Sequence, residues 1–472
     1  MGVNNVMQTG RSGLLAAKSG IATSGHNIAN ANTEGFNRQR VQVNAEATES
    51  KNGPKAMIGR GVRDVRVNRV NDEYVEKQIR EGNRNLAFTE ERDVSLRQVE
   101  DIFNEMSGEG LNRVMTKFFN EFRKLSNDPD NEAIRQSVRE ASQAMVTDFH
   151  RIRKEVDEVR KHIDSRITGY VREMNALGEE LKELNLKIKI SSIGGASPND
   201  LLDRRDIVMK ELASFVDLQA HKDNEGSYVV EIKGGGPFVS GTVSSKLHAE
   251  TSPADEFGKV DGSLDIRSES SNSPTVTQSI SGGKLGALIE TRDKTLSAIS
   301  GRMDEIAFNL AHAVNEIHSQ GFNRYGQQGV AYFKAPEQID RAAEVLELSD
   351  AVRENINFIA TAAQPDAPGD NRIALAITGL QGLKLMNDGK STLDDFYNSI
   401  VADVGVATDR NRSAMNQNKD IVMQLGKMRE QISGVSIDEE TTNLLQFQHT
   451  FDASAKVIQI ADEMLKTILD LR

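Results

Sequence analysis

Cysteine is absent from all 472 residues of the chain. Its absence excludes disulfide bonds, metal sites built from thiolates and catalysis by a cysteine nucleophile. Tryptophan is also absent, there are only nine prolines, and aromatic residues make up 5% of the chain. A sequence with so few helix breakers and aromatics favours long helices that are stabilised by packing alone.

Long apolar runs and basic blocks are missing as well. No run of about eighteen apolar residues occurs, so the sequence predicts no membrane-spanning helix. The amino end lacks the charged-then-apolar order of a cleavable signal peptide. Lys and Arg number 58 against 70 Asp and Glu, which gives a net charge of -12. An acidic chain of this kind is not expected to bind nucleic acid or a membrane surface.

Residues with catalytic or metal-binding potential do not form recognisable motifs. The eight histidines are scattered, with no HExxH and no pair four residues apart, so we predict no metal site. Gly389-Lys390-Ser391 resembles the end of a phosphate-binding loop, but Lys384 stands where that loop needs its first glycine. Glu439 and Glu440 are expected to form a solvated helix start, where negative charge suits the helix dipole. We therefore predict no enzyme activity and no cofactor.

Both ends of the chain carry a seven-residue hydrophobic repeat, which is typical of coiled-coil helices. At the amino end the alternate row is mostly small, with Gly10, Ala17 and Ser24, and would let a partner helix approach closely. We expect the two ends to pair, and to need neighbouring subunits because isolated helices are marginally stable. The large residues of this assembly seam are Met7, Leu14, Ile21, Ile28, Leu444, Phe447, Phe451, Ile458, Leu465 and Ile468.

The first half of the chain is predicted to be helical. Apolar residues spaced three and four apart predict a helix region from Asn85 to Leu125 and one continuous helix from Glu132 to Ile188, about 90 Å long. A shorter helix to about Phe215 follows.

The second half begins with a change of period to two. Alternation around Asp223 to Gly226 predicts a β-hairpin, with further strands to about Ser281. Helical spacing returns from Leu285 to Ile317, with Gly321 at the expected C-terminal cap. A last helical region runs from Leu393 to Ile432.

This order means that the chain goes out and returns, so its domains are expected to be nested. We predict an elongated, mainly α fold with a smaller β part, in which the terminal helices pair as a coiled coil and long helices fill the central domain. The expected domains are a terminal coiled-coil domain with its hinge (1–45 plus 433–472), a mainly helical rod domain (46–220 plus 283–432) and an inserted β-rich segment (221–282).

The polar stretch NIANANTEGFNRQ, residues 27–39, follows the first heptads directly. Asn32-Thr33-Glu34-Gly35 fits a turn with Asn first and Gly fourth. We interpret the stretch as a hinge between the terminal helix and the body, with Arg38, Gln39 and Arg40 as candidate contacts with adjacent subunits. The hinge residues are Asn30, Asn32, Thr33, Gly35, Phe36, Arg38 and Gln39.

The two ends resemble the bacterial flagellar axial family of rod, hook and hook-associated proteins. SGHNIANANTEGFNRQRVQV (24–43) is similar to the family signature Asn-Ile-Ala-Asn-x-x-Thr-x-Gly-aromatic, and the residues from Ser433 to Arg472 match the carboxyl end. Four internal segments resemble, in particular, the first hook-filament junction proteins of this family. They are SPNDLLDRRDIVMKELA, SGGKLGALIETRD, GVAYF and PGDNRIALAI.

The resemblance implies a structural protein that forms a ring of about eleven copies and adapts the hook lattice to the filament lattice. It implies as partners the flagellar hook protein, a second junction protein (hook-associated protein 3) and a cytoplasmic export chaperone that holds the C-terminal helix. It also implies an extracellular position on the flagellum, reached by type III export without a cleaved signal peptide.

Three alternatives remain open from the sequence. A hook or distal-rod subunit would have the same ends, but its body is expected to be mainly β, so helices across 85–190 favour the junction protein. An enzyme, such as a peptidoglycan hydrolase, would need two close carboxylates with shifted pKa values. The third alternative, an adhesin, is supported only by the Ser-rich segment 251–281.

Overall fold

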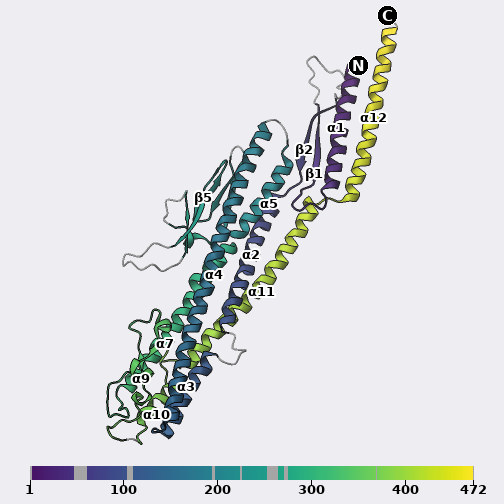
Figure 1. Ribbon diagram of the computed structural model, residues 1–472. Coiled ribbons are helices and arrows are strands. Elements are labelled where there is room, and N and C mark those ends of the chain that lie inside the picture. Colours follow the sequence, from purple (N-terminus) through teal and green to yellow (C-terminus); the bar gives the residue numbers. More distant parts are fainter. Residues whose placement is uncertain are drawn as a thin grey trace.

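The computed structural model describes residues 3–46, 61–103, 110–193, 197–223, 226–251, 264–269, 275–367 and 369–470. They form an elongated, mainly helical molecule with small sheets and with both ends of the chain at the same pole (Figure 1). The predicted fold class is confirmed. In the described part of the chain, no helix has the length and apolar character needed to cross a membrane.

The body is a bundle of long helices that run along the molecular axis. α4 has 62 residues and buries one stripe from Val138 to Ile188, so the predicted long helix is confirmed and ends slightly later than expected. α3 packs on α4, α4 on α5, α5 on α2, and α2 on α11. The bounds of these helices are α2 Glu73–Ile102, α3 Leu111–Asn127, α4 Glu132–Ile193, α5 Asn199–Phe215 and α11 Leu393–Ser433.

The β part packs on one side of α4. Its main sheet is an antiparallel meander in the order β3-β4-β5-β6, and β7 pairs separately with β8. Phe238 approaches α4 at Gly178, and Asn185 Nδ2 donates to the carbonyls of Tyr228 and Gly241 at 3.2 and 2.8 Å. The strands are β3 Leu218–Lys222, β4 Tyr228–Ile232, β5 Gly236–Ser240, β6 Val243–Ser244, β7 Leu247–Thr251 and β8 Leu264–Ser268.

The predicted hairpin is confirmed by the pairing of β3 with β4. The further strands expected up to Ser281 are only partly found. Thr277–Ser279 form a 3-10 turn, η2, and residues 252–263 and 270–274 lie outside the described part of the chain.

The chain returns through α6 (Gly283–Glu290), a π-helical turn η3 (Thr291–Leu296) and α7 (Ser297–His318). The prediction that Gly321 caps this helix is wrong, because α7 ends at His318 and is capped by Ser319 with ordinary right-handed dihedrals. A Cβ at Gly321 would lie 2.9 Å from Ala360 Cβ. Glycine is therefore needed there for close packing and not for a left-handed turn.

Residues 319–392 form a head at the pole opposite to the chain ends (Figure 1). Two buried side chains fix its central segment, 359–361. Arg135 donates to the Ile359 carbonyl and to Thr361 Oγ1 at 2.7 and 3.1 Å, while His318 Nε2 accepts from the Ala360 amide at 2.8 Å. The short elements of the head are β9 Phe333–Lys334, α8 Ala342–Val345, β10 Glu347–Leu348, α9 Asp350–Glu354, η4 Ile356–Phe358, α10 Arg372–Gly379 and η5 Leu380–Gly382.

We expect the stability of the protein to fall as the pH falls from about 6.5 to about 4, because burial lowers the pKa of His318 from its ordinary value to about 4. In this range the unfolded chain binds a proton that the folded chain does not, so unfolding is favoured. Between about pH 7 and about pH 5 this loss amounts to about 2 kcal/mol. Urea unfolding of the wild type and of His318→Gln at the two pH values measures it as the difference in pH dependence. An equal pH dependence in both proteins would refute the assignment.

Candidate assembly site at the terminal helices

The two terminal helices, α1 (Val3–Ala29) and α12 (Ile437–Asp470), lie side by side (Figure 1). The small residues of α1 face α12. A Cβ at Gly10 would lie 2.8 Å from Ile458 Cγ1, and one at Gly20 would lie 2.5 Å from the Phe447 ring. The expected pairing and its close approach at small residues are therefore found, while the supercoil itself stays a prediction.

The large seam residues are only partly covered in the single chain. Those of α1 and most of those of α12 are half-buried, whereas Ile468 is 55% exposed. An open groove of about 690 Å³ runs between α1, the start of β2 and α12, and it is lined by Gly10, Gly13 and Val457 among others. The half-buried seam residues are Met7, Leu14, Ile21, Ile28, Leu444, Phe447, Phe451, Ile458 and Leu465.

The hinge joins α1 to a two-stranded antiparallel hairpin, β1 (Gln39–Ala45) and β2 (Val62–Arg69). Its hydrogen-bonded turns are Asn30 to Thr33 and Thr33 to Phe36, with amide-to-carbonyl distances of 2.9 and 3.2 Å, so the predicted turn is displaced by one residue. Gly35 is the third residue of the second turn and has φ 79°, which a type II turn requires. Phe36 packs edge-on against the ring of His26 at 5.4 Å. Asn32 is exposed.

We call the region where the hinge meets the start of α12 the elbow (residues 27–39 and 433–440). Asn27 is fully buried there and donates to the Gln39 carbonyl at 2.8 Å and to Glu440 Oε2 at 3.1 Å. Glu440 is 2% exposed. The prediction that Glu440 belongs to a solvated helix start is therefore wrong, because α1 and the hinge cover it.

Arg38 completes the elbow. Its Nε donates to Glu440 Oε1 at 2.7 Å, and its two terminal nitrogens donate to both oxygens of Glu439 at 3.1 and 2.8 Å. The hydrogen bonds and charge of Arg38 lower the pKa of Glu439. The Arg38 amide also donates to the Ser433 carbonyl at 2.9 Å. A two-point guanidinium-carboxylate contact fixes orientation as well as distance, so the start of α12 is held at a defined angle to the hinge.

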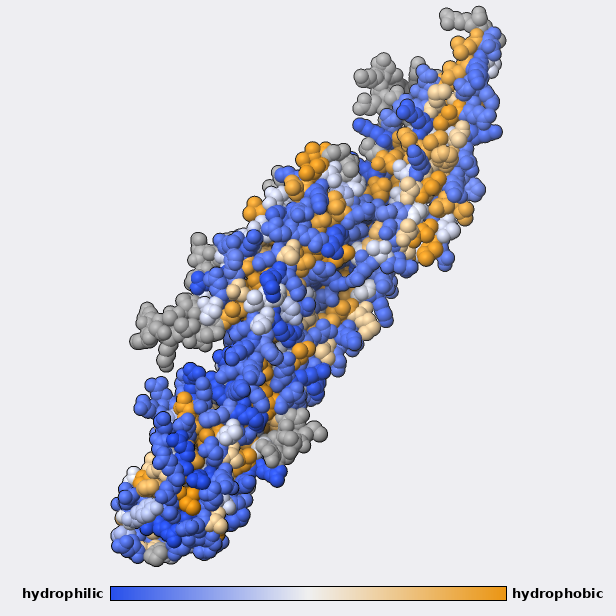
Figure 2. Space-filling model, viewed as in Figure 1, coloured by the Kyte–Doolittle hydropathy of each residue, from blue (hydrophilic) through white to orange (hydrophobic). Residues whose placement is uncertain are grey.

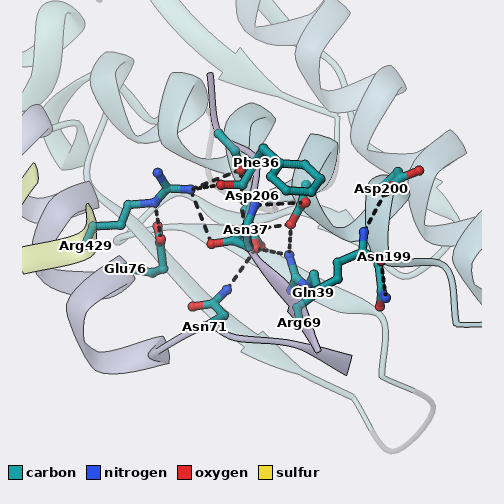
Figure 3. Close-up of polar contacts among 12 residues, drawn as sticks. Phe36, Asn37, Gln39, Arg69, Asn71, Glu76, Asn199, Asp200, Asp206 and Arg429 are labelled. Carbon is teal, nitrogen blue, oxygen red and sulfur yellow. Dashed lines mark hydrogen bonds and ion pairs between the residues drawn. The ribbon is translucent and has the colours of Figure 1, made fainter. Parts of the chain in front are cut away.

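One face of α5 holds the other side of the hinge (Figure 3). Asp203 accepts from both the amide and the side chain of Asn37, at 3.2 and 2.7 Å, and from Arg69 at 2.7 Å. Arg69 also donates to Asp206 at 2.8 Å. Asn199 donates to Gln39 Oε1 at 3.2 Å. These groups are largely buried, so their mutual pairing is what makes their burial tolerable.

Arg429, near the end of α11, reaches the hinge from the opposite side (Figure 3). It donates to Glu76 Oε1 at 2.8 Å and to the carbonyls of Gly35 and Phe36 at 3.0 and 3.3 Å. α2, α5, α11 and α12 therefore all fix the hinge.

The structure changes the view of the predicted hinge residues. Arg38 and Gln39 have partners within the chain, so the single chain does not offer them to adjacent subunits, whereas Arg40 is exposed. The sequence interpretation missed Asn37, Asp203, Asp206, Arg69 and Arg429. The spacing of Asn199, Asp203 and Asp206, by four and three, could have indicated a polar helix face, but not its partners.

The described residues contain no group of three or more His, Asp or Glu side chains that could hold a metal ion. Burial raises the pKa of Glu91 and of Asp304, but Glu91 is paired with Arg166 and Tyr170, and Asp304 accepts from the Ala343 amide at 2.9 Å. The two carboxylates lie on different helices, α2 and α7.

Comparison with known proteins identifies related families in three segments. Residues 96–333 match the family described as the flagellar hook-associated protein FlgK helical domain. Residues 7–37 match the flagella basal body rod protein family, and residues 430–471 match the flagellar basal body rod FlgEFG protein C-terminal family. The two rod-type matches contain all ten seam residues and all of the elbow except Arg38 and Gln39.

Two relatives that align with the chain over nearly their whole length are both described as flagellar hook-associated protein 1. The chain is 30% identical to flagellar hook-associated protein 1 of Bacillus subtilis, over 98% of this chain and 97% of that protein. It is 24% identical to the protein of that name from Escherichia coli, over 100% and 99%. The solved structure of the flagellar hook junction protein FlgK from Burkholderia pseudomallei aligns with a TM-score of 0.66 at 16% identity, covering 77% of this chain and all of the other, so the two share a fold.

Proposed function

The chain belongs to the flagellar hook-associated protein 1 family, and from this premise we propose that it forms the junction between hook and filament and adapts one lattice to the other. One observation carries the proposal. The terminal helices leave their large seam residues half-covered beside an open apolar groove, while the elbow fixes their angle to a well-packed body. Half-covered apolar helices of this kind are completed by neighbouring helices.

The finer points of the proposal follow from the same arrangement. We infer a ring of about eleven copies, in which α1 and α12 form an inner tube and the body an outer layer. The partners would be the flagellar hook protein on one side and hook-associated protein 3 on the other. Before assembly a cytoplasmic chaperone would cover α12, whose apolar residues Leu445, Met464 and Leu469 are more than half exposed. The chain would be exported without a cleaved signal peptide, would act outside the cell, and would have no catalytic role.

The rival proposal is a hook or distal-rod subunit. The described residues between 85 and 190 are helical throughout, apart from the helix ends at 103, 110 and 128–131. A hook body is expected to be mainly β, so this segment favours the junction protein.

Complementation tests the proposed function. A strain of the same species in which the gene for this chain is deleted should shed its filament subunits. Expression of the chain in that deletion strain should restore attached filaments and swimming. Electron microscopy with a labelled chain should place the label between hook and filament. Label along the hook, or on the rod, would refute the junction assignment in favour of the rival.

A further inference from the structure

Most of α11 lies beyond the apolar core of the body. On this helix the core ends at Val404, and after it the buried residues are Thr408, Asn411 and Ser433, all of them polar. We call residues 405–433 the distal segment of α11. Because α2 is the main neighbour of α11 (Figure 1), the distal segment is held largely by its contacts with one helix.

Two asparagines bind the distal segment to α2. Asn411 Nδ2 donates to the Thr89 carbonyl at 2.8 Å. Asn418 Nδ2 donates to the Asn85 carbonyl at 3.3 Å and to Thr89 Oγ1 at 3.4 Å. Asn411 and Thr89 are 5% and 6% exposed. The two asparagines are seven residues apart and therefore lie on the same face of α11, and we call them the asparagine pair.

Other contacts between the distal segment and α2 fix its orientation less strictly. A Cβ added at Gly82 would lie 3.3 Å from both Val422 and Leu425, so apolar packing resumes there, but apolar side chains can repack when a helix rotates. Arg412 Nε lies 3.4 Å from Asp93 Oδ1, with the Arg412 side chain 45% exposed. An ion pair with so exposed a partner contributes little.

The hydrogen bonds of the asparagine pair are more demanding. An amide donor needs an acceptor that is both close and aligned. A buried amide that loses its acceptor costs about 1 to 3 kcal/mol. Rotation of the distal segment on α2 would separate Asn411 from the Thr89 carbonyl, so the pair favours one orientation of the segment.

The orientation of the distal segment sets the contacts of the elbow. Arg429 follows Asn411 by about five helical turns, so the two side chains lie on the same face of α11. Arg429 donates to the Gly35 carbonyl at 3.0 Å. At the end of the segment, the Ser433 carbonyl accepts from the Arg38 amide at 2.9 Å. A rotated distal segment would carry both groups away from the hinge.

The end of α11 also directs α12. Only residues 434–436 separate the two helices. Hydrophobic residues run along the terminal helices (Figure 2). The direction in which α12 leaves α11 therefore decides where these hydrophobic residues are offered to neighbouring copies.

We propose that Asn411 and Asn418 are positioning residues for assembly, because their bonds to α2 fix the orientation of the distal segment and, through it, of the elbow and the terminal helices. The assembly role rests on the proposed function. Replacing buried polar groups by apolar ones of similar volume is often neutral or stabilising. A role in positioning can therefore be separated from a role in stability.

Spin-label distances test the orientation directly, since the chain has no cysteine of its own. Labels are attached to Lys187→Cys on α4 and Lys427→Cys on α11, both exposed positions, in the full chain with and without Asn411→Leu and Asn418→Leu. The chain with both asparagines should give one narrow distance, and the double leucine variant a broader or second distance. Without labels, that variant should keep or raise its urea unfolding midpoint and give about tenfold fewer attached filaments in the deletion strain.

Asn416→Leu is the matched control. It makes the same change at an exposed position about 140° around α11 from Asn411. The label distance, the unfolding midpoint and the number of attached filaments should all stay at their wild-type values.

The outcomes separate the two proposals. An unchanged narrow distance in the double leucine variant would overturn this inference and leave the proposed function standing. A large fall in the unfolding midpoint would overturn it as well, since it would assign the asparagine pair to stability. Normal filaments despite a changed distance would overturn the assembly role. Absence of the wild-type chain from the hook-filament junction would overturn the proposed function and the assembly role, whereas the label distances would still decide whether the pair fixes the distal segment.

Discussion

A chain that ends at Gly434 is expected to keep a folded body and to lose assembly into the junction completely. α12 packs mainly on α1, and the buried core of the body runs from Val99 to Val404, so the truncation removes no residue of that core. α11 keeps its last carbonyl contact, since the Gly434 amide donates to the Glu430 carbonyl at 2.9 Å. Asn27 and Arg38 lose Glu440, and α1 loses its partner helix.

Two measurements check this expectation. Urea unfolding followed by circular dichroism should show a body whose midpoint changes little, and the deletion strain that expresses the truncated chain should form no attached filaments. A chain that ends at Asp470, which lacks only the last two residues, is the control and should assemble. Junctions formed by the truncated chain would show that the seam is not needed.

Gly35→Val is expected to leave the body folded but to lower assembly by up to about 30-fold. A β-branched residue at φ 79° is strained, and its Cβ would lie 2.5 Å from the Ile207 side chain on α5. A cost of about 2 kcal/mol lowers the ratio of the native elbow to other conformations about 30-fold, which is the upper limit of the loss of competent chains. The count of attached filaments per cell, together with the amount of variant chain in isolated flagella, measures the effect.

Gly25→Val is the matched control for this prediction. Gly25 lies on α1, its added Cβ would meet nothing within 4 Å, and its φ is not positive. A second control, Ile207→Ala in the Gly35→Val chain, removes the clash but keeps the backbone strain, so assembly should recover only in part. Wild-type assembly by Gly35→Val alone would contradict the account of the elbow.

The elements with strong local periodicity could be read from the sequence. The repeat from Glu132 to Ile188 became α4, and the alternation on both sides of residues 223–226 became β3 and β4. These predictions succeeded because the pattern of apolar residues follows the geometry of a single element. Gly321 and the segment around Thr277 failed, since their backbone conformation depends on distant packing.

The candidate site was predictable only in part. The repeats indicated the seam, and the asparagine-rich stretch indicated the hinge. Neither could reveal that Glu440 is buried, because its partner Arg38 is about 400 residues away in the chain. The same holds for Asp203 with Asn37 and for Arg429 with Gly35.

The sequence by itself determined the helical class, the outward and returning course of the chain and the apolar character of both ends, since each of these depends on composition and on local spacing. Only the tertiary structure decided which charged groups are buried, how the elbow holds α12, and which apolar residues remain exposed. Burial and pairing depend on which distant segments meet, and no local pattern in a single sequence contains that information.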